Sequence, residues 1–256
     1  MINKLKNMEL EYIRCFAEEK EFENHIEFRD EMFRDTYTSN VSVINKYIDD
    51  NELINIINNK FKIFKEKKKH FLNIEINEYV SEDIIKILIK RPKRVDRFNY
   101  LLIESMNYSN LDQEGQVFLK DVKSSSEFKN LIDVNVKDNE KILGRSYSLY
   151  RIKRKIKSYK DSKNNLEAYI CYCNNKPIGS CEVLRIDKIC KIEDVGILKR
   201  YRGKGFGSYM INKILEENHK RGIEYTYLIS EEKGEAERLY IRLGFTKFAE
   251  KTQLIW

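Results

Sequence analysis

Apolar residues recur along this chain with two periods, one typical of helices and one typical of strands. Between residues 41 and 68, Leu53, Ile57 and Phe61 return at four-residue spacing among Lys, Glu and Asn, which predicts an amphipathic helix. Further on, Ser81 is suited to cap a second helix that Pro92 would end. The elements expected in the first part of the chain are two short strands within 10–38, the helix within 41–68, a strand over 71–76, a helix over 81–90 and a strand over 97–105.

A polar segment over 107–116, NYSNLDQEGQ, interrupts both periods and is the best candidate for a linker. The pattern beyond it predicts a second unit. Its expected elements are a strand over 116–122, helices over 125–143 and 145–160, a hairpin over 168–185, a strand over 191–197, a helix over 208–222, a strand over 224–230, a helix over 234–244 and closing strands over 245–251 and 252–256. Because hairpins alternate with helical crossovers, we expect an α/β (α+β) fold whose sheet mixes strand directions.

The composition indicates a folded chain with a basic surface. Apolar residues make up 41% of the 256 residues, and the formal net charge is +7. We interpret the excess charge as a solvated, Lys-rich surface, while a positive field for a polyanion stays open. The stretch over 145–160 holds seven Lys or Arg residues, no acidic residue and interleaved tyrosines. It predicts either a nucleic-acid-binding helix or a solvated helix face, and we favour the second.

The cysteines and the N-terminus suggest where the protein works. Five cysteines form no CxxC pair, and Cys171 and Cys173 would share one face of a strand, where core packing is the favoured interpretation. The N-terminal segment lacks the apolar stretch of a signal peptide, and no run approaches the ~18 apolar residues of a membrane span. We therefore expect a cytoplasmic protein that does not contact a membrane.

The segment over 192–211, IEDVGILKRYRGKGFGSYMI, is the most informative for function. A strand runs into glycines at alternate positions, Gly203, Gly205 and Gly207, and a helix begins there. Uncovered backbone N–H groups and a helix N-terminus together favour a diphosphate. The third glycine comes one residue too early for the dinucleotide-binding pattern G-x-G-x-x-G, and the pattern of a Walker A loop is absent.

This segment resembles the pyrophosphate-binding signature of the GNAT N-acetyltransferase superfamily, [QR]-x-x-G-x-[GA], with Arg202, Gly205 and Gly207 in the defining positions. About 33 residues downstream, ERLYIRLGF resembles the second signature of the family. The matching residues there are Leu239, Tyr240, Leu243, Gly244 and Phe245. The resemblance covers roughly 117–256, and the order and distance of the two signatures make it specific.

The resemblance implies a fold and a cofactor. It implies a GNAT domain over 117–256, with a mixed, mostly antiparallel central sheet flanked by helices, and acetyl-CoA as the co-substrate. The family pairs the pantetheine with the strand before the loop, here at Ile197, and admits it where that strand splays from the next one. The residues that the resemblance assigns to the diphosphate loop are Arg202, Gly203, Lys204, Gly205, Phe206, Gly207 and Ser208.

The resemblance also implies a direct attack of an amine on the thioester. Tyr240 matches the tyrosine that serves the family as general acid, and Glu193 lies on the strand where many relatives have the base. By strand alternation Asp194 would point to the opposite face. The sequence departs from the family at Lys233, where relatives often have Asn, and this puts cofactor contacts from that loop in doubt.

The part over 1–110 has the same helix, strand, helix, strand order but no G-x-G. We interpret it as a smaller α/β domain, either a degenerate second GNAT-like copy or an unrelated extension, and expect no coenzyme A binding there. The expected function is N-acetyltransferase, acting on an amine of a small molecule or a protein. A non-catalytic acyl-CoA sensor and an RNA-associated acyl or aminoacyl transferase stay open as alternatives. We expect neither a metal nor a nucleic-acid partner, and a homodimer stays open.

Overall fold

The protein folds into two compact units that do not follow the order of the sequence. The computed structural model describes residues 1–45, 49–67, 70–109 and 116–256, so residues 110–115 of the expected linker lie outside it. Unit 1 consists of Met1–Tyr100, Ser230–Glu237 and Lys247–Trp256, and unit 2 consists of Leu101–Ile229 and Arg238–Thr246. The domains expected over 1–110 and 117–256 differ from these units chiefly because the end of the chain belongs to unit 1.

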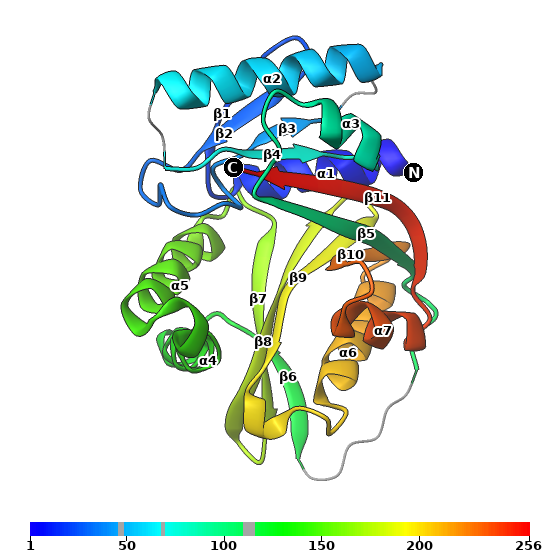
Figure 1. Ribbon diagram of the computed structural model, residues 1–256. Helices are drawn as coiled ribbons and strands as arrows, with labels where there is room; N and C mark the ends of the chain where they lie inside the picture. Colours follow the sequence, from blue (N-terminus) through cyan, green and yellow to red (C-terminus); the bar gives the residue numbers. More distant parts are fainter. Residues whose placement is uncertain (46–48, 68–69, 110–115) are drawn as a thin grey trace. The chain divides into compact units, whose positions relative to one another are not determined.

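Unit 1 is a sheet with helices on both faces (Figure 1). Its strands, in the order β1-β2-β3-β4-β11, are β1 (Glu18–Glu21), β2 (Ile26–Arg29), β3 (Ser42–Ile44), β4 (Asn73–Ile76) and β11 (Thr246–Ile255). All neighbours are antiparallel except β3 and β4. Its helices are α1 (Ile2–Arg14), α2 (Asp50–Glu66) and α3 (Glu82–Ile87). The strand β5 (Arg94–Glu104) begins in this unit.

Alternation along β3 separates the two layers of this unit. Val43 packs with Leu10 and Ile13 of α1, whereas Ile44 packs with Leu53 and Ile57 of α2. Neighbouring residues of a strand point to opposite faces, so one short strand contributes to both cores.

Unit 2 repeats this layered plan with longer elements (Figure 1). Its strands, in the order β10-β9-β8-β7-β6, are β6 (Val117–Asp121), β7 (Leu166–Cys173), β8 (Lys176–Ile186), β9 (Ile189–Ile197) and β10 (Tyr225–Glu231). Only β9 and β10 are parallel. Its helices are α4 (Ser125–Leu143), α5 (Arg145–Lys160), α6 (Phe206–Lys220) and α7 (Glu235–Arg242), whose first residues belong to unit 1.

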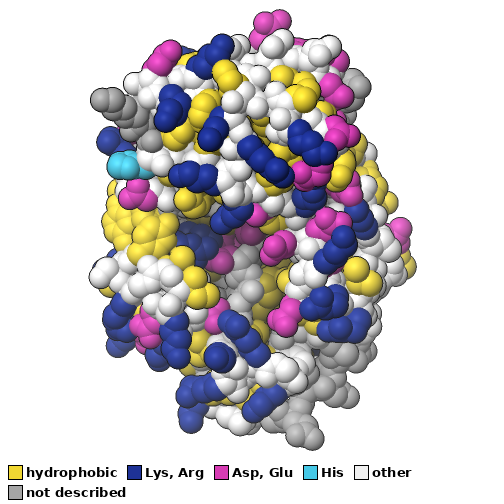
Figure 2. Space-filling view, viewed as in Figure 1, with side chains coloured by type: hydrophobic (Ala, Val, Ile, Leu, Met, Phe, Trp, Pro, Cys, Tyr) yellow, Lys and Arg dark blue, Asp and Glu magenta, His cyan; other side chains and the backbone are white. Residues whose placement is uncertain are grey.

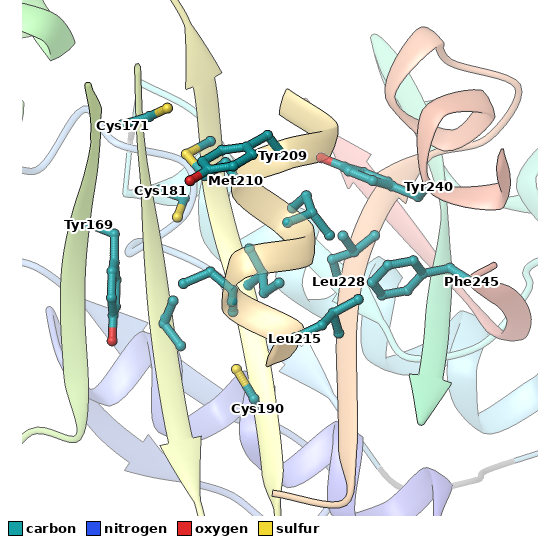
Figure 3. Close-up of a cluster of buried hydrophobic side chains, with 14 of the residues drawn as sticks. Tyr169, Cys171, Cys181, Cys190, Tyr209, Met210, Leu215, Leu228, Tyr240 and Phe245 are labelled. Carbon is teal, nitrogen blue, oxygen red and sulfur yellow. The ribbon is translucent and has the colours of Figure 1, made fainter. Parts of the chain in front are cut away.

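The expected mixed, mostly antiparallel sheet flanked by helices is therefore confirmed. In unit 2, Ala168 and Ile170 of β7 face α4 and α5, while Tyr169 and Cys171 face α6. Cys171 is fully buried and Cys173 packs against the same cluster, which confirms the core interpretation of this pair. The central part of that cluster is drawn in Figure 3.

Three expected elements were wrong. Residues 10–14 belong to a helix rather than a strand, because Leu5, Met8 and Ile13 of α1 recur with helical spacing and bury one face. The expected helix within 41–68 begins only at Asp50, and β3 precedes it. The two closing strands are one continuous strand, β11.

Each unit contains the final strand of the other part of the sequence. The end of β11 pairs antiparallel with β4 in unit 1, where Thr252 lies opposite Ile76. Reciprocally, Leu101 and Ile103 of β5 belong to the buried core of unit 2. In both units a parallel β-α-β crossover is followed by a further helix, which is the order expected of two related domains.

Candidate active site

The glycine-rich loop joins the end of β9 to the N-terminus of α6. A short 3-10 turn, η1 (Lys199–Tyr201), leads into it. Gly203 and Gly205 have φ of +74° and +82°, in the left-handed region that glycine adopts without steric cost. Gly205 is the N-cap of α6, so the sequence R-G-K-G turns the chain sharply and starts the helix.

The backbone N–H groups of this loop are open. From Gly203 to Ser208 none has a hydrogen-bond acceptor within the described part of the chain. No side chain caps α6, and its first turn contains no acidic residue. Gly207 lies where an added Cβ would be 3.6 Å from Leu239, an ordinary contact. The loop therefore presents a row of donors at the positive end of a helix, suited to an anion.

Basic side chains surround these donors. Lys199, Arg200, Arg202 and Lys204 are all exposed, and Lys and Arg side chains gather toward the lower end of the view in Figure 2. Arg202 also shapes the loop, because its Nε donates to the Ile197 carbonyl at 2.7 Å and its terminal nitrogen lies 2.7 Å from Asp138 of α4. The Arg202 guanidinium is thus turned toward the end of β9.

The strand β9 has an open edge just before the loop. Its parallel pairing with β10 covers Ile189 to Lys191, opposite Tyr225 to Tyr227. Farther along, as far as Ile197, the described pairing of β9 is with β8 alone. Backbone groups on the β10 side of β9 are therefore accessible to an extended ligand beside the loop.

A bulge interrupts β9 within this open stretch. Ser180 is opposite Gly196 and Glu182 is opposite Glu193, so the single residue Cys181 faces both Asp194 and Val195. Asp194 has φ of +51°. The expectation that Asp194 points away from the face of Glu193 was wrong. Lys155 contacts both Asp194 and Glu182, and Glu182 shares the face of Glu193, because the bulge breaks the alternation.

Glu193 and Tyr240 occupy different surroundings. Glu193 is half-buried, and its carboxylate forms an ion pair with the buried Lys191 at 2.9 Å. Tyr240 of α7 is 7% exposed, and its hydroxyl points toward the side of α6 that carries Tyr209 and Met210 (Figure 3). Within the described residues this hydroxyl has no hydrogen-bond partner.

The pKa of Tyr240 is raised. Burial is the main cause, followed by the negative charge of Glu193 and then by Cys181. The Tyr240 hydroxyl therefore keeps its proton throughout the neutral pH range. Glu193 itself lies opposite Glu182 and outside the buried cluster that contains Tyr240.

A second charged cluster, which the sequence analysis did not predict, lies on the α5 side of β8 and β9. Glu182 is 3% exposed and pairs with Lys155, which also lies 2.9 Å from Asp194. Arg151 contacts both carboxylate oxygens of Asp194 at 3.1 Å. Arg151 and Lys155 are four residues apart beside the buried Ile152, a spacing that could have marked an inward-facing pair. Arg151 and Lys155 are therefore held in ion pairs, while Lys153, Lys157 and Lys160 of the same helix are exposed.

No group of three or more His, Cys, Asp or Glu residues suited to a metal ion occurs in the described residues. Among the helices that the structure describes, none combines the length and the apolar character that crossing a bilayer requires.

The comparison with known families decides the assignment. Residues 164–247, from β7 to the start of β11, match the family described as Acetyltransferase (GNAT) domain. The chain carries a GNAT domain. This confirms the family that the two sequence signatures indicated.

The chain also resembles individual proteins. It is 31% identical over 112 residues to the uncharacterized N-acetyltransferase CgeE of Bacillus subtilis (strain 168), covering 41% of this chain and 42% of the relative. A functionally unknown conserved protein from Staphylococcus epidermidis ATCC 12228 superposes with a TM-score of 0.74 at 19% identity, covering 93% of both chains. A GCN5-related N-acetyltransferase from Kribbella flavida gives a TM-score of 0.71 at 15% identity, covering 99% of this chain and 95% of the other. The two structures show a shared fold that includes the N-terminal residues.

Proposed function

We propose that the protein is an acetyl-CoA-dependent N-acetyltransferase that transfers an acetyl group to a primary amine of a small molecule or a protein. The open row of amides from Gly203 to Ser208, next to the open edge of β9, is the observation that carries this proposal. A GNAT domain without the row would have no place for a diphosphate.

The residues of the loop fit coenzyme A. The amides from Gly203 to Ser208 would hold the diphosphate, and Lys199, Arg200 and Lys204 would supply positive charge around it. Ile197 and its neighbours on β9 would pair with the pantetheine. Arg202 would support the loop through the Ile197 carbonyl. When bound, acetyl-CoA supplies an activated thioester.

The chain's own side chains would handle the protons. The acceptor must lose a proton to attack as a neutral amine, and the Glu193 carboxylate is the proposed acceptor of that proton, directly or through water. The departing thiolate needs a proton, and Tyr240 holds one that burial keeps in place. The remaining work of the protein is to hold the two substrates in line.

Unit 1 is not expected to bind coenzyme A. The helix α2 occupies the place in unit 1 that α6 has in unit 2, after a strand of the parallel pair. Its N-cap is Asp49, whose carboxylate accepts from the Glu52 amide at 3.0 Å, and Asp50 and Glu52 add negative charge in the first turn. The Asp49 carboxylate already accepts from an amide that a diphosphate would need, and the negative charges in the first turn would repel the diphosphate. We therefore propose that unit 1 is a degenerate GNAT-like copy.

The alternatives lead to different measurements. An acyl-CoA sensor would bind acetyl-CoA without turnover. An RNA-associated transferase would bind RNA with a strong dependence on salt. The commitment of Arg151 and Lys155 to buried ion pairs leaves α5 with fewer free cations for RNA.

Titration calorimetry with acetyl-CoA tests the proposal. We expect saturable binding by the wild type and none by Gly207→Glu, because the added carboxylate would enter the diphosphate site. Gly207→Ala is the matched control and should bind nearly as well, since its Cβ has only ordinary contacts. Gly205 is a poorer choice, because its φ of +82° would strain any other residue. A folded Gly207→Glu variant with wild-type affinity would contradict the assignment. Turnover against polyamines, aminoglycosides and peptides would then identify the acceptor.

A further inference from the structure

The bulge of β9 is held from one side by α5. Asp194 lies in the bulge with a left-handed φ of +51°. Its carboxylate accepts hydrogen bonds from Arg151 at 3.1 Å and from Lys155 at 2.9 Å. Both cations come from successive turns of α5. Lys155 is 8% exposed, so its contact with Asp194 is partly shielded from water, which strengthens the attraction between the two charges.

The charged side chains around Asp194 connect the β9 bulge to its neighbouring elements. Lys155 bridges Asp194 and the buried Glu182. Glu182 belongs to β8 and lies opposite Glu193 of β9. Arg151 also contacts the side chain of Asn135 on α4 at 3.3 Å. The bulge is thereby tied to α5 and α4 and to the neighbouring strand.

The anchored residues stand next to the open edge of β9. Val195 completes the bulge, and Gly196 lies between the bulge and Ile197, where the proposed function has the pantetheine and its thioester. A bulge redirects the backbone groups and side chains beside it. A change in its angle would therefore change the direction of the Val195 and Gly196 backbone and of Glu193.

We propose that Asp194 is a positioning residue for acyl transfer, which fixes the β9 bulge through Arg151 and Lys155 so that the strand presents its backbone and Glu193 to the reacting groups. This inference rests on the proposed function. The inference goes beyond the proposed function because it assigns to α5 a role in the reaction geometry and not in binding.

Asp194→Asn is the test, because asparagine has the same shape and tolerates a positive φ but lacks the charge. Asp187→Asn is the matched control. Asp187 is an exposed aspartate with φ of +52° in the turn between β8 and β9. The same substitution at Asp187 therefore removes a charge at a similar φ without disturbing the contacts of α5 with the bulge. Arg151→Gln removes the main partner and leaves β9 untouched.

We expect Asp194→Asn to lower kcat about tenfold with the panel amine that turns over fastest, a loss typical of misplaced groups. The dissociation constant for acetyl-CoA should stay within about twofold, since the loop itself is intact. Arg151→Gln should act in the same direction, and Asp187→Asn should match the wild type. Amide hydrogen exchange in a peptide covering 192–198 should quicken in the first two variants alone.

Two results would overturn the inference. One is a kcat for Asp194→Asn equal to that of Asp187→Asn, and the other is a loss explained wholly by weaker acetyl-CoA binding. If the wild type itself neither binds nor uses acetyl-CoA, the proposed function fails. The amide hydrogen exchange measurement then tests only whether the ion pairs of Asp194 hold the bulge. Unchanged exchange over 192–198 in Asp194→Asn and Arg151→Gln would show that the ion pairs do not hold the bulge.

Discussion

At the scale of single residues, a buried hydroxyl that keeps its proton is suited to donate it late in a reaction. Tyr240→Phe removes only that hydroxyl. We expect kcat to fall by roughly 10²-fold, within the usual range for one general acid, with little change in the acetyl-CoA dissociation constant. Because the Tyr240 hydroxyl has no hydrogen-bond partner among the described residues, stability should scarcely change. Steady-state kinetics beside a thermal melt measures both effects.

Tyr169→Phe is the control for this substitution. Tyr169 is buried in the same cluster, but its hydroxyl lies 2.8 Å from a carboxylate oxygen of Glu167 and 2.8 Å from one of Glu217, and it can donate its single proton to either. The control should therefore lose stability, about 1 kcal/mol for a hydrogen bond, and keep its turnover. Wild-type turnover in Tyr240→Phe on a verified acceptor would show that Tyr240 is a core residue and that another group is the acid.

Residue types alone indicated part of the candidate site. Gly203 and Gly205 could be recognised because a left-handed backbone favours glycine, and the structure has both in that region. The face of Asp194 could not be predicted, because alternation holds only in a regular strand and nothing in the residues around 194 marks a bulge. The partners of Asp194 come from a helix some 40 residues earlier in the chain, beyond the reach of a local pattern.

At the scale of elements, the N-terminus of α4 shows how local side chains fix a helix end. Ser124 and Glu127 form a reciprocal capping box, in which the Glu127 carboxylate accepts from the Ser124 amide at 2.7 Å and also pairs with Lys120. These interactions hold the carboxylate in its charged form. The Lys120 side chain, then the backbone N–H groups of Ser124 and Lys123, lower the pKa of Glu127 from 4.5 to about 2.

Glu127→Gln should therefore destabilise the protein in a pH-dependent way. A carboxyl whose pKa is lower in the folded state contributes stability above its unfolded pKa, and loses it as the pH falls through the folded value. At pH 7 we expect a loss of about 1 kcal/mol, typical of a helix cap. The difference from the wild type should shrink between roughly pH 4.5 and pH 2. Urea unfolding across this range is the measurement, and a loss that does not vary with pH would contradict the assignment.

Elements with strong periodicity were predictable, and the weakly patterned ones were not. The helix α4 and the hairpin of β7 and β8 are long enough for their period to be unambiguous, and the structure has both where they were expected. The segment over 10–14 was misjudged because its mixed polar and apolar residues, taken without residues 2–9, also fit a short strand. β3 has only three residues, too few for any period to appear.

At the scale of the whole molecule, the exchange of final strands lay outside what sequence patterns can show. Periodicity predicts closing strands over 245–251 and 252–256 but does not say which sheet they join. Pairing depends on partners distant in sequence, and β11 finds β4 some 176 residues earlier, where Lys251 bonds Glu75 at 2.8 Å. The two buried clusters that contain residues of β5 and β11 therefore combine side chains from both halves of the sequence.

Trp256 is the test of this arrangement, because chain ends are usually tolerant of change. Its ring packs with Phe61 of α2 within the core of unit 1, and its Nε1 donates to the Lys90 carbonyl at 2.9 Å. We expect Trp256→Ala to cost about 3–5 kcal/mol in unit 1, as for other buried aromatics. Trp256→Phe should lose less, and Ile142→Ala, at a side chain 85% exposed, should lose almost nothing. Urea unfolding followed by circular dichroism compares the three, since Trp256 is the sole tryptophan and its fluorescence disappears with it. If Trp256→Ala unfolds at the same urea concentration as Ile142→Ala, the end of β11 does not stabilise unit 1.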